Sequence, residues 1–412
     1  MESMSDVRAV TESAVIKRAA YKARTVDAAA RDAAISELQA VMARREPFAS
    51  RVDIRLDDEQ GFVVDGPNRR VVALGAPAEC RFHMNPLNLS HMAQGQLDPR
   101  MAILFSQLQM QDGAMRTAVA FGDWLADRKV SIRPLTNQAL PTPTRDRERQ
   151  RHDLEAFGYA LVEGALTPEE VKVLRQRVIE QAAGEREAGV ASVSEGSQVV
   201  WALLNKGRVF HDLLLNPLID EFVPEVLGEH PILTGIVSII ATPGGKTTTM
   251  HLDQSFVQPA IPQFQTGLNI LWFLDDVSEA NGGTRIMPAS HLGGVAPADP
   301  SSPEGTIAAE GPAGTALLLD SRVWHATGNN RTDKARHLVV SYLSRAFMRA
   351  QENYFLSLRP ELEDTLDEKV RIMLGYRCTA SLGAVEGPIE GKMNRRPAEP
   401  VGELKPVSRP GH

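Results

Sequence analysis

The sequence contains few cysteines and no apolar run long enough to cross a membrane. Among its 412 residues only Cys80 and Cys378 are cysteines, which excludes a disulfide scaffold or a thiolate zinc cage and fits a reducing compartment. The longest apolar stretch, around Pro231–Ala241, is about half of the ~20 residues that a bilayer span needs. Acidic residues near the N-terminus argue against a transit peptide. We therefore expect a cytoplasmic protein without a membrane partner.

The sequence also lacks an excess of basic charge. Its 45 lysines and arginines are outnumbered by 52 aspartates and glutamates, which gives a formal net charge of −7. We therefore expect no nucleic-acid partner, because a surface that follows phosphates is normally basic. Hydrophobic residues make up 43% and charged residues 24%, as in an ordinary globular protein, and the length allows two or three domains.

The patterning changes along the chain near a proline- and charge-rich stretch at Ser131–Arg151. Before it, Asp27–Arg45 and Met101–Arg128 have helical apolar spacing, and Arg51–Leu74 alternates around a turn as in a hairpin. We expect four segments: a mostly helical extension of unknown role (1–145), a main domain (150–350), a helical segment that packs on the core (351–385) and an extended tail (386–412).

The main domain begins with helical signals and continues with strand signals. Thr167, Pro168 and Glu170 form the capping box that typically begins a helix. Four β-rich runs are then separated by glycine, proline and asparagine turns, at 232–241, 267–274, 315–319 and 336–343. Short strands in this arrangement are typical of a sandwich or a closed barrel.

Two histidines and one aspartate stand in positions that suit a metal ion. His251 and Asp253 are two residues apart, so on an extended chain their side chains point to the same side. His325 follows much later, at the end of an apolar strand. Each signal alone is typical of a hydrogen-bonded structural residue. Together, two histidines and a carboxylate are the ligand set of non-haem Fe(II) oxygenases.

An arginine and a threonine extend this candidate site. Arg336 follows His325 across a turn and opens the next strand, where its planar guanidinium can hold a carboxylate with two hydrogen bonds. Thr327, two residues after His325, offers a hydroxyl group.

These residues belong to a pattern that resembles the phytanoyl-CoA dioxygenase (PhyH-like) family of Fe(II)/2-oxoglutarate oxygenases. The resemblance covers roughly residues 154–375, and its motifs are Phe157–Glu170, His251-Leu-Asp253, Leu271–Asp276, Asn281-Gly-Gly-Thr-Arg-Ile-Met-Pro-Ala-Ser-His291, and Trp324–Asn329 with Arg336. It implies an α+β fold with a double-stranded β-helix (jelly-roll, cupin-like) core and flanking helices. The largely helical N-terminal extension lies outside the family pattern.

The resemblance also implies roles for single residues. The metal ligands fall on His251, Asp253 and His325, and these three would carry the catalysis. Arg336 falls on the residue that binds the 2-oxoglutarate carboxylate, and Thr327 falls on a position that contacts the same cosubstrate. The sequence departs from the family on the strand after His251-Leu-Asp253, where many members have Trp or Gln and this chain has Asn269. We expect the Asn269 side chain to form a hydrogen bond with the cosubstrate.

The implied reaction is the oxidation of a small organic molecule, by hydroxylation or a related C–H oxidation, in secondary-metabolite metabolism. Fe(2+) is the cofactor, and 2-oxoglutarate and O2 are the cosubstrates, with 2-oxoglutarate decarboxylated to succinate. We expect substrate contacts from Trp201, Asn205 and Gln254. The sequence does not choose between hydroxylation, desaturation, epoxidation and cyclisation.

Other interpretations stay open at this point. One is a cupin-like metal enzyme that does not use 2-oxoglutarate, and another is a non-catalytic binding module of the same fold. A homodimer is an option, because the N-terminal extension and an expected helix at Glu361–Leu374 have apolar faces. These faces would equally serve for packing against the barrel.

Overall fold

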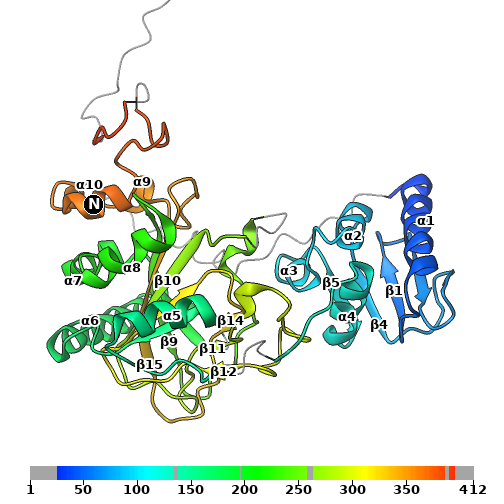
Figure 1. Ribbon diagram of the computed structural model, residues 1–412, viewed down its shortest axis with the longest axis horizontal. Helices are drawn as coiled ribbons and strands as arrows, with labels where there is room; N and C mark the ends of the chain where they lie inside the picture. Colours follow the sequence, from blue (N-terminus) through cyan, green and yellow to red (C-terminus); the bar gives the residue numbers. More distant parts are fainter. Residues whose placement is uncertain (1–25, 134–137, 195, 258–262, 386–388, 395–412) are drawn as a thin grey trace, which may run out of the picture.

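The computed structural model describes residues 26–133, 138–194, 196–257, 263–385 and 389–394. Figure 1 shows an N-terminal part (residues 26–133, blue to cyan) beside a larger main part (residues 138–394). Most of the expected tail, 386–412, lies outside the described residues. None of the described helices is long and apolar enough to span a membrane.

The N-terminal part has a sheet of its own. Its helices are α1 (Ala28–Arg44), α2 (Pro86–Ala93), α3 (Pro99–Leu104) and α4 (Met115–Leu125), and its strands are β1 (Arg51–Arg55), β2 (Gly61–Asp65), β3 (Arg70–Val72), β4 (Cys80–His83) and β5 (Gln109–Gly113). The strand order is β3-β2-β1-β4-β5, with β1 and β4 parallel. Leu38 and Val41 of α1 pack with Val52 and Ile54 of β1 in one hydrophobic cluster.

The structure confirms two local predictions here and corrects a third. Asp27 caps α1, and β2 pairs with β3 in the predicted hairpin. The expected helix over Met101–Arg128 is wrong, because β5 separates α3 from α4. The backbone turns out of the helical region at Ser106 (φ 57°) and Gly113 (φ 82°). This strand is part of the sheet that the expectation of a mostly helical extension did not include.

The main part contains a seven-stranded sheet of order β6-β13-β10-β15-β9-β8-β7. Its strands are β6 (Tyr159–Val162), β7 (Ser192–Val193), β8 (Ser197–Val200), β9 (Ile232–Ala241), β10 (Gly267–Phe273), β13 (Ala316–Asp320) and β15 (Arg336–Ser344). All of its pairings are antiparallel. The four predicted β-rich runs are confirmed as β9, β10, β13 and β15.

A second, three-stranded sheet of order β12-β11-β14 carries one of the predicted metal ligands. It consists of β11 (Arg285–Ile286), β12 (Ile307–Ala308) and β14 (His325–Ala326). Leu271 and Val340 of the seven-stranded sheet belong to the same hydrophobic cluster as Ile286 of the three-stranded sheet.

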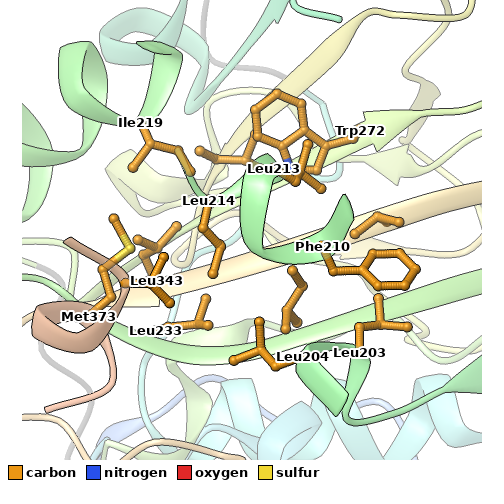
Figure 2. Packing of buried hydrophobic residues seen from close by; sticks show 14 of the residues in the cluster. Leu203, Leu204, Phe210, Leu213, Leu214, Ile219, Leu233, Trp272, Leu343 and Met373 are labelled. Carbon is orange, nitrogen blue, oxygen red and sulfur yellow. The ribbon is translucent and has the colours of Figure 1, made fainter. Parts of the chain in front are cut away.

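Helices cover the other face of the seven-stranded sheet. They are α5 (Arg147–Phe157), α6 (Pro168–Glu187), α7 (Arg208–Leu213) and α8 (Pro217–Leu227), followed near the C-terminus by α9 (Tyr354–Ser357), α10 (Pro360–Glu363) and α11 (Glu368–Met373). Figure 2 shows Trp272 of β10 and Leu343 of β15 packed among helical residues such as Leu213 and Met373. Because side chains alternate along a strand, this packing leaves Asn269 and Leu271 on the opposite face.

Two helix predictions have opposite outcomes. The Thr167 capping box is confirmed: its hydroxyl accepts from the Glu170 N–H, and the Glu170 carboxylate accepts from the Thr167 N–H. The single helix expected at Glu361–Leu374 is wrong, because α10 ends at Glu363 and Asp367 caps a separate helix, α11.

Candidate active site

The two predicted metal histidines lie side by side on paired backbone segments. The N–H of each donates to the carbonyl of the other, His251 to His325 at 2.9 Å and His325 to His251 at 3.0 Å. Their ring centroids are 4.3 Å apart. Residues far apart in the sequence are therefore held together by backbone hydrogen bonds, before any ion is considered.

Asp253 completes the group of ligands. Its Oδ1 lies 3.6 Å from His251 Nε2 and its Oδ2 lies 3.4 Å from His325 Nε2. One ligand atom from each of the three residues falls within 4.8 Å of the others. Bonds of about 2.1 Å to one octahedral ion would place neighbouring ligand atoms about 3 Å apart, so the three residues fit a single metal ion.

The surroundings prepare both imidazoles for metal binding. Nδ1 of His251 lies 2.9 Å from the Thr249 carbonyl, and Nδ1 of His325 lies 2.9 Å from the Val323 carbonyl. A carbonyl only accepts, so the proton sits on Nδ1 and Nε2 keeps its lone pair for the metal. Burial also lowers the pKa of His325, which favours the neutral, metal-binding form.

Asn269 acts on the third ligand. Its side-chain amide donates to Oδ2 of Asp253, which orients the carboxylate. Because Asn269 also lines the cavity above the metal ligands, its expected hydrogen bond to the cosubstrate stays a prediction.

Arg336 is buried at the start of β15 with part of its hydrogen-bonding capacity unused. Nη2 donates to the Gly282 carbonyl, but Nε and Nη1 have no partner among the described residues. The side chain is 1% exposed. Burial lowers the pKa of Arg336 to about 10, so the guanidinium remains charged near neutral pH. A buried cation with free donors is a site for an anion such as a carboxylate.

The Asn-Gly-Gly motif explains the position of the Gly282 carbonyl. Asn281 bridges to Asn330, and its side chain accepts from the Ser278 N–H. Gly282 has a φ of 87°, and a Cβ there would lie 2.9 Å from the Gly328 carbonyl oxygen. Only glycine therefore allows the close approach that brings this carbonyl to Arg336.

One cavity of about 210 Å³ is lined by the three candidate metal ligands and Arg336. Thr327 and Trp201 line it, and the walls between are mainly aliphatic. Their expected contacts with the cosubstrate and the substrate stay predictions. Sequence reasoning missed Thr284 and Tyr342, which line it too. The Tyr342 hydroxyl is buried without a partner among the described residues. The alternation of Arg336 and Tyr342 along one strand face was the signal for the latter.

The other two predicted substrate residues do not line this cavity. Asn205 donates to the Ser357 carbonyl and accepts from the Arg359 N–H, so it holds the C-terminal segment. Gln254 is buried and accepts from the Thr266 N–H at 2.8 Å, so it holds the loop that follows Asp253. Both amides serve the backbone in this structure.

Part of the chain is similar to known proteins. Residues 154–338 match the family model of phytanoyl-CoA dioxygenase (PhyH). Dioxygenase af480 of Aspergillus fumigatus is 26% identical over 235 residues, which are 55% of this chain and 76% of the relative. Dioxygenase FUM3 of Gibberella moniliformis is 30% identical over 192 residues, 42% of this chain and 62% of the relative.

Among solved structures, HygX from Streptomyces hygroscopicus with nickel and 2-oxoglutarate bound is similar over 50% of this chain and 89% of its own. The sequence identity is 16% and the TM-score is 0.42.

The family match and the dioxygenases among the relatives define the class: the protein is a 2-oxoglutarate-dependent dioxygenase. Within that class, residues 154–338 are similar to the phytanoyl-CoA dioxygenase (PhyH) family. The resemblance that the sequence motifs indicate is thereby confirmed.

Proposed function

We propose that the protein uses Fe(II) and 2-oxoglutarate to oxidise a C–H bond of a small organic molecule, with O2 as oxidant and succinate and CO2 as coproducts. The observation that carries this proposal is Arg336, a buried cation in the same cavity as His251, Asp253 and His325. Two of its nitrogen atoms have no hydrogen-bond partner in the described part of the chain. This pairing of a metal triad with an anion site suits a dicarboxylate that binds the metal at one end.

Each residue has a defined role in this proposal. His251, Asp253 and His325 hold the ion on one side and leave its other positions open. Arg336 binds the far carboxylate of 2-oxoglutarate, Thr327 adds a hydroxyl contact, and Asn269 keeps Asp253 oriented. When bound, the iron and 2-oxoglutarate supply dioxygen activation and the oxidising equivalents.

The chain's apolar residues give the reaction a dry environment. Leu271, Leu338 and Val340 line the cavity beside the metal ligands. Their side chains exclude water, which strengthens the ion pair between Arg336 and a bound carboxylate.

We propose that the two sheets form a double-stranded β-helix. Support comes from the antiparallel pairing within each sheet, and from the cavity, which is lined by β10 and β15 of the larger sheet and by β14 of the smaller one. Residues 150–350 are then the oxygenase domain, and 351–385 pack on it through α11.

The proposed substrate is small, largely apolar and uncharged, and belongs to secondary metabolism. The cavity wall is aliphatic apart from the metal ligands, Arg336 and a few neutral polar groups. Trp201 remains a proposed substrate contact at this wall. The Tyr342 hydroxyl, which has no partner within the described ranges, supports a substrate that carries a hydrogen-bond acceptor. We keep the cytoplasm as the proposed location, which the two free, buried cysteines support.

The test is an anaerobic titration of metal-free protein with Fe(II) and then 2-oxoglutarate, followed by visible absorbance. We expect a metal-to-ligand charge-transfer band that is absent from His251→Ala and weakened in Arg336→Ala. Bound iron without such a band would overturn the proposal and favour a metal enzyme that does not use 2-oxoglutarate.

A further inference from the structure

The side chains directly before the two metal histidines point away from the metal. Met250 precedes His251 and Trp324 precedes His325, and neighbouring residues on an extended chain point to opposite sides. Met250 is fully buried and Trp324 is 4% exposed. Both belong to one hydrophobic cluster behind the histidines.

The N-terminal part contributes to this cluster. Met101 of α3 is one of its buried members, and Leu104, Val130 and Ile132 pack against it. The remaining members come mainly from residues 287–300, which we call the linking segment. In Figure 1, α3 is the helix of the N-terminal part that lies nearest to the main part, on the side of β11, β12 and β14.

Hydrogen bonds connect the same elements. The Ser131 N–H donates to the Gly294 carbonyl at 2.7 Å, and the Ala296 N–H donates to the Ser131 carbonyl at 3.0 Å. At its other end the linking segment accepts from the Met250 N–H, through the Pro300 carbonyl at 2.7 Å. The N-terminal part is thus connected to the residue next to His251.

Arg100 makes this connection rigid. It is fully buried, and its guanidinium donates to both carboxylate oxygens of Asp123, at 2.9 and 2.6 Å. Its Nε donates to the Pro297 carbonyl at 2.6 Å. The bidentate salt bridge with Asp123 fixes the plane of the guanidinium group. The hydrogen bond from Nε to Pro297 therefore fixes the position of the linking segment.

From these contacts we infer that the N-terminal part positions the metal ligands: Met101 and Arg100 act through the linking segment to hold His251 and His325 at their mutual distance. This role rests on the proposed metal site and gives residues 26–133 a function in the oxygenase. Neither residue touches the metal or the substrate, so both are positioning residues. Their loss should weaken metal binding because residues that orient metal ligands typically change affinity 10- to 100-fold.

The experiment compares two methionines of the N-terminal part in the full-length protein. Met101→Ala removes the contact with the cluster behind the histidines. Met92→Ala removes a fully buried methionine from the separate core of the N-terminal part, and serves as the matched control. The probe is Mn(II), which accepts the same nitrogen and oxygen ligands as Fe(II), and free Mn(II) is counted by electron paramagnetic resonance. Circular dichroism sets a temperature at which all variants are folded.

We expect Met101→Ala to bind Mn(II) about tenfold more weakly and Met92→Ala to bind within twofold of the wild type. Met101→Leu, which conserves the volume, should restore the affinity. Arg100→Lys keeps the positive charge but loses the planar guanidinium group, so it should also weaken Mn(II) binding.

Three results would overturn the inference: equal losses in the two alanine variants, no loss in either, or no rescue by leucine. Wild-type protein that binds no Mn(II) would instead overturn the proposed metal site, so the two failures are distinguishable.

Discussion

Replacement of Arg336 by methionine should weaken the binding of 2-oxoglutarate and, at the same time, raise the stability of the ligand-free protein. The guanidinium has two nitrogen atoms without partners among the described residues, and each is available for a charge-assisted hydrogen bond to 2-oxoglutarate. Such bonds contribute about 1.5–3 kcal/mol each. Their joint loss is worth about 3–6 kcal/mol, or roughly 10²- to 10⁴-fold in the dissociation constant of 2-oxoglutarate.

The ligand-free protein should respond in the opposite way. Burial lowers the pKa of Arg336 from its ordinary value to about 10, which reflects roughly 3 kcal/mol of unfavourable desolvation of the cation. A methionine of similar length removes this cost and gives up one hydrogen bond to the Gly282 carbonyl. We therefore expect Arg336→Met to be about 1–3 kcal/mol more stable than the wild type without ligand.

Urea unfolding of the ligand-free protein and calorimetric titration with 2-oxoglutarate in the presence of Mn(II) measure the two effects. Arg345 is the matched control, because it follows β15 directly and donates to the Gln265, Val226 and Leu227 carbonyls. Arg345→Met should lose stability and keep the affinity for 2-oxoglutarate. Wild-type affinity in Arg336→Met, or a loss of stability equal to that of Arg345→Met, would refute the reasoning.

Three further predictions concern Asn269, Glu352 and Gly158. Asn269→Ala removes the hydrogen bond to the Asp253 carboxylate and should weaken Mn(II) binding about tenfold, as measured by electron paramagnetic resonance of free Mn(II). Unchanged binding would show that the amide does not orient this carboxylate. Burial raises the pKa of Glu352 to about 7, so the native state holds a proton that the unfolded chain releases near pH 4.5. Stability should therefore fall between pH 4.5 and 7 by at most roughly 3 kcal/mol, and urea titrations should find this slope reduced in Glu352→Gln. Gly158 has a φ of 78° and a Cβ there would lie 2.3 Å from Val323 Cγ2, so Gly158→Ala should lower the melting temperature by several degrees, and an unchanged value would contradict this.

Local patterns in the sequence predicted the elements that depend on local physics. β9 and β15 lie where short apolar runs end at turn residues, and α6 begins at its capping box. The grouping of His251, Asp253 and His325 was predictable for a similar reason, because His251 and Asp253 are close in the chain and His325 has its own motif. Each of these signals lies within a few residues of the feature that it predicts.

Side chains whose contacts lie far away in the sequence have no local sequence pattern that predicts those contacts. An amide looks the same in the sequence whether it binds a ligand or the backbone, so the sequence does not reveal that Asn205 and Gln254 hydrogen-bond to loop backbone. The bond from Arg100 to Pro297 joins residues 197 positions apart, on two parts of the chain with separate patterns. The sequence also does not reveal where Met101 is buried, because an apolar residue on α3 could equally pack within the N-terminal part. Contacts of this kind become visible only in the fold, and they are the ones that connect the N-terminal part to the linking segment beside His251 and His325.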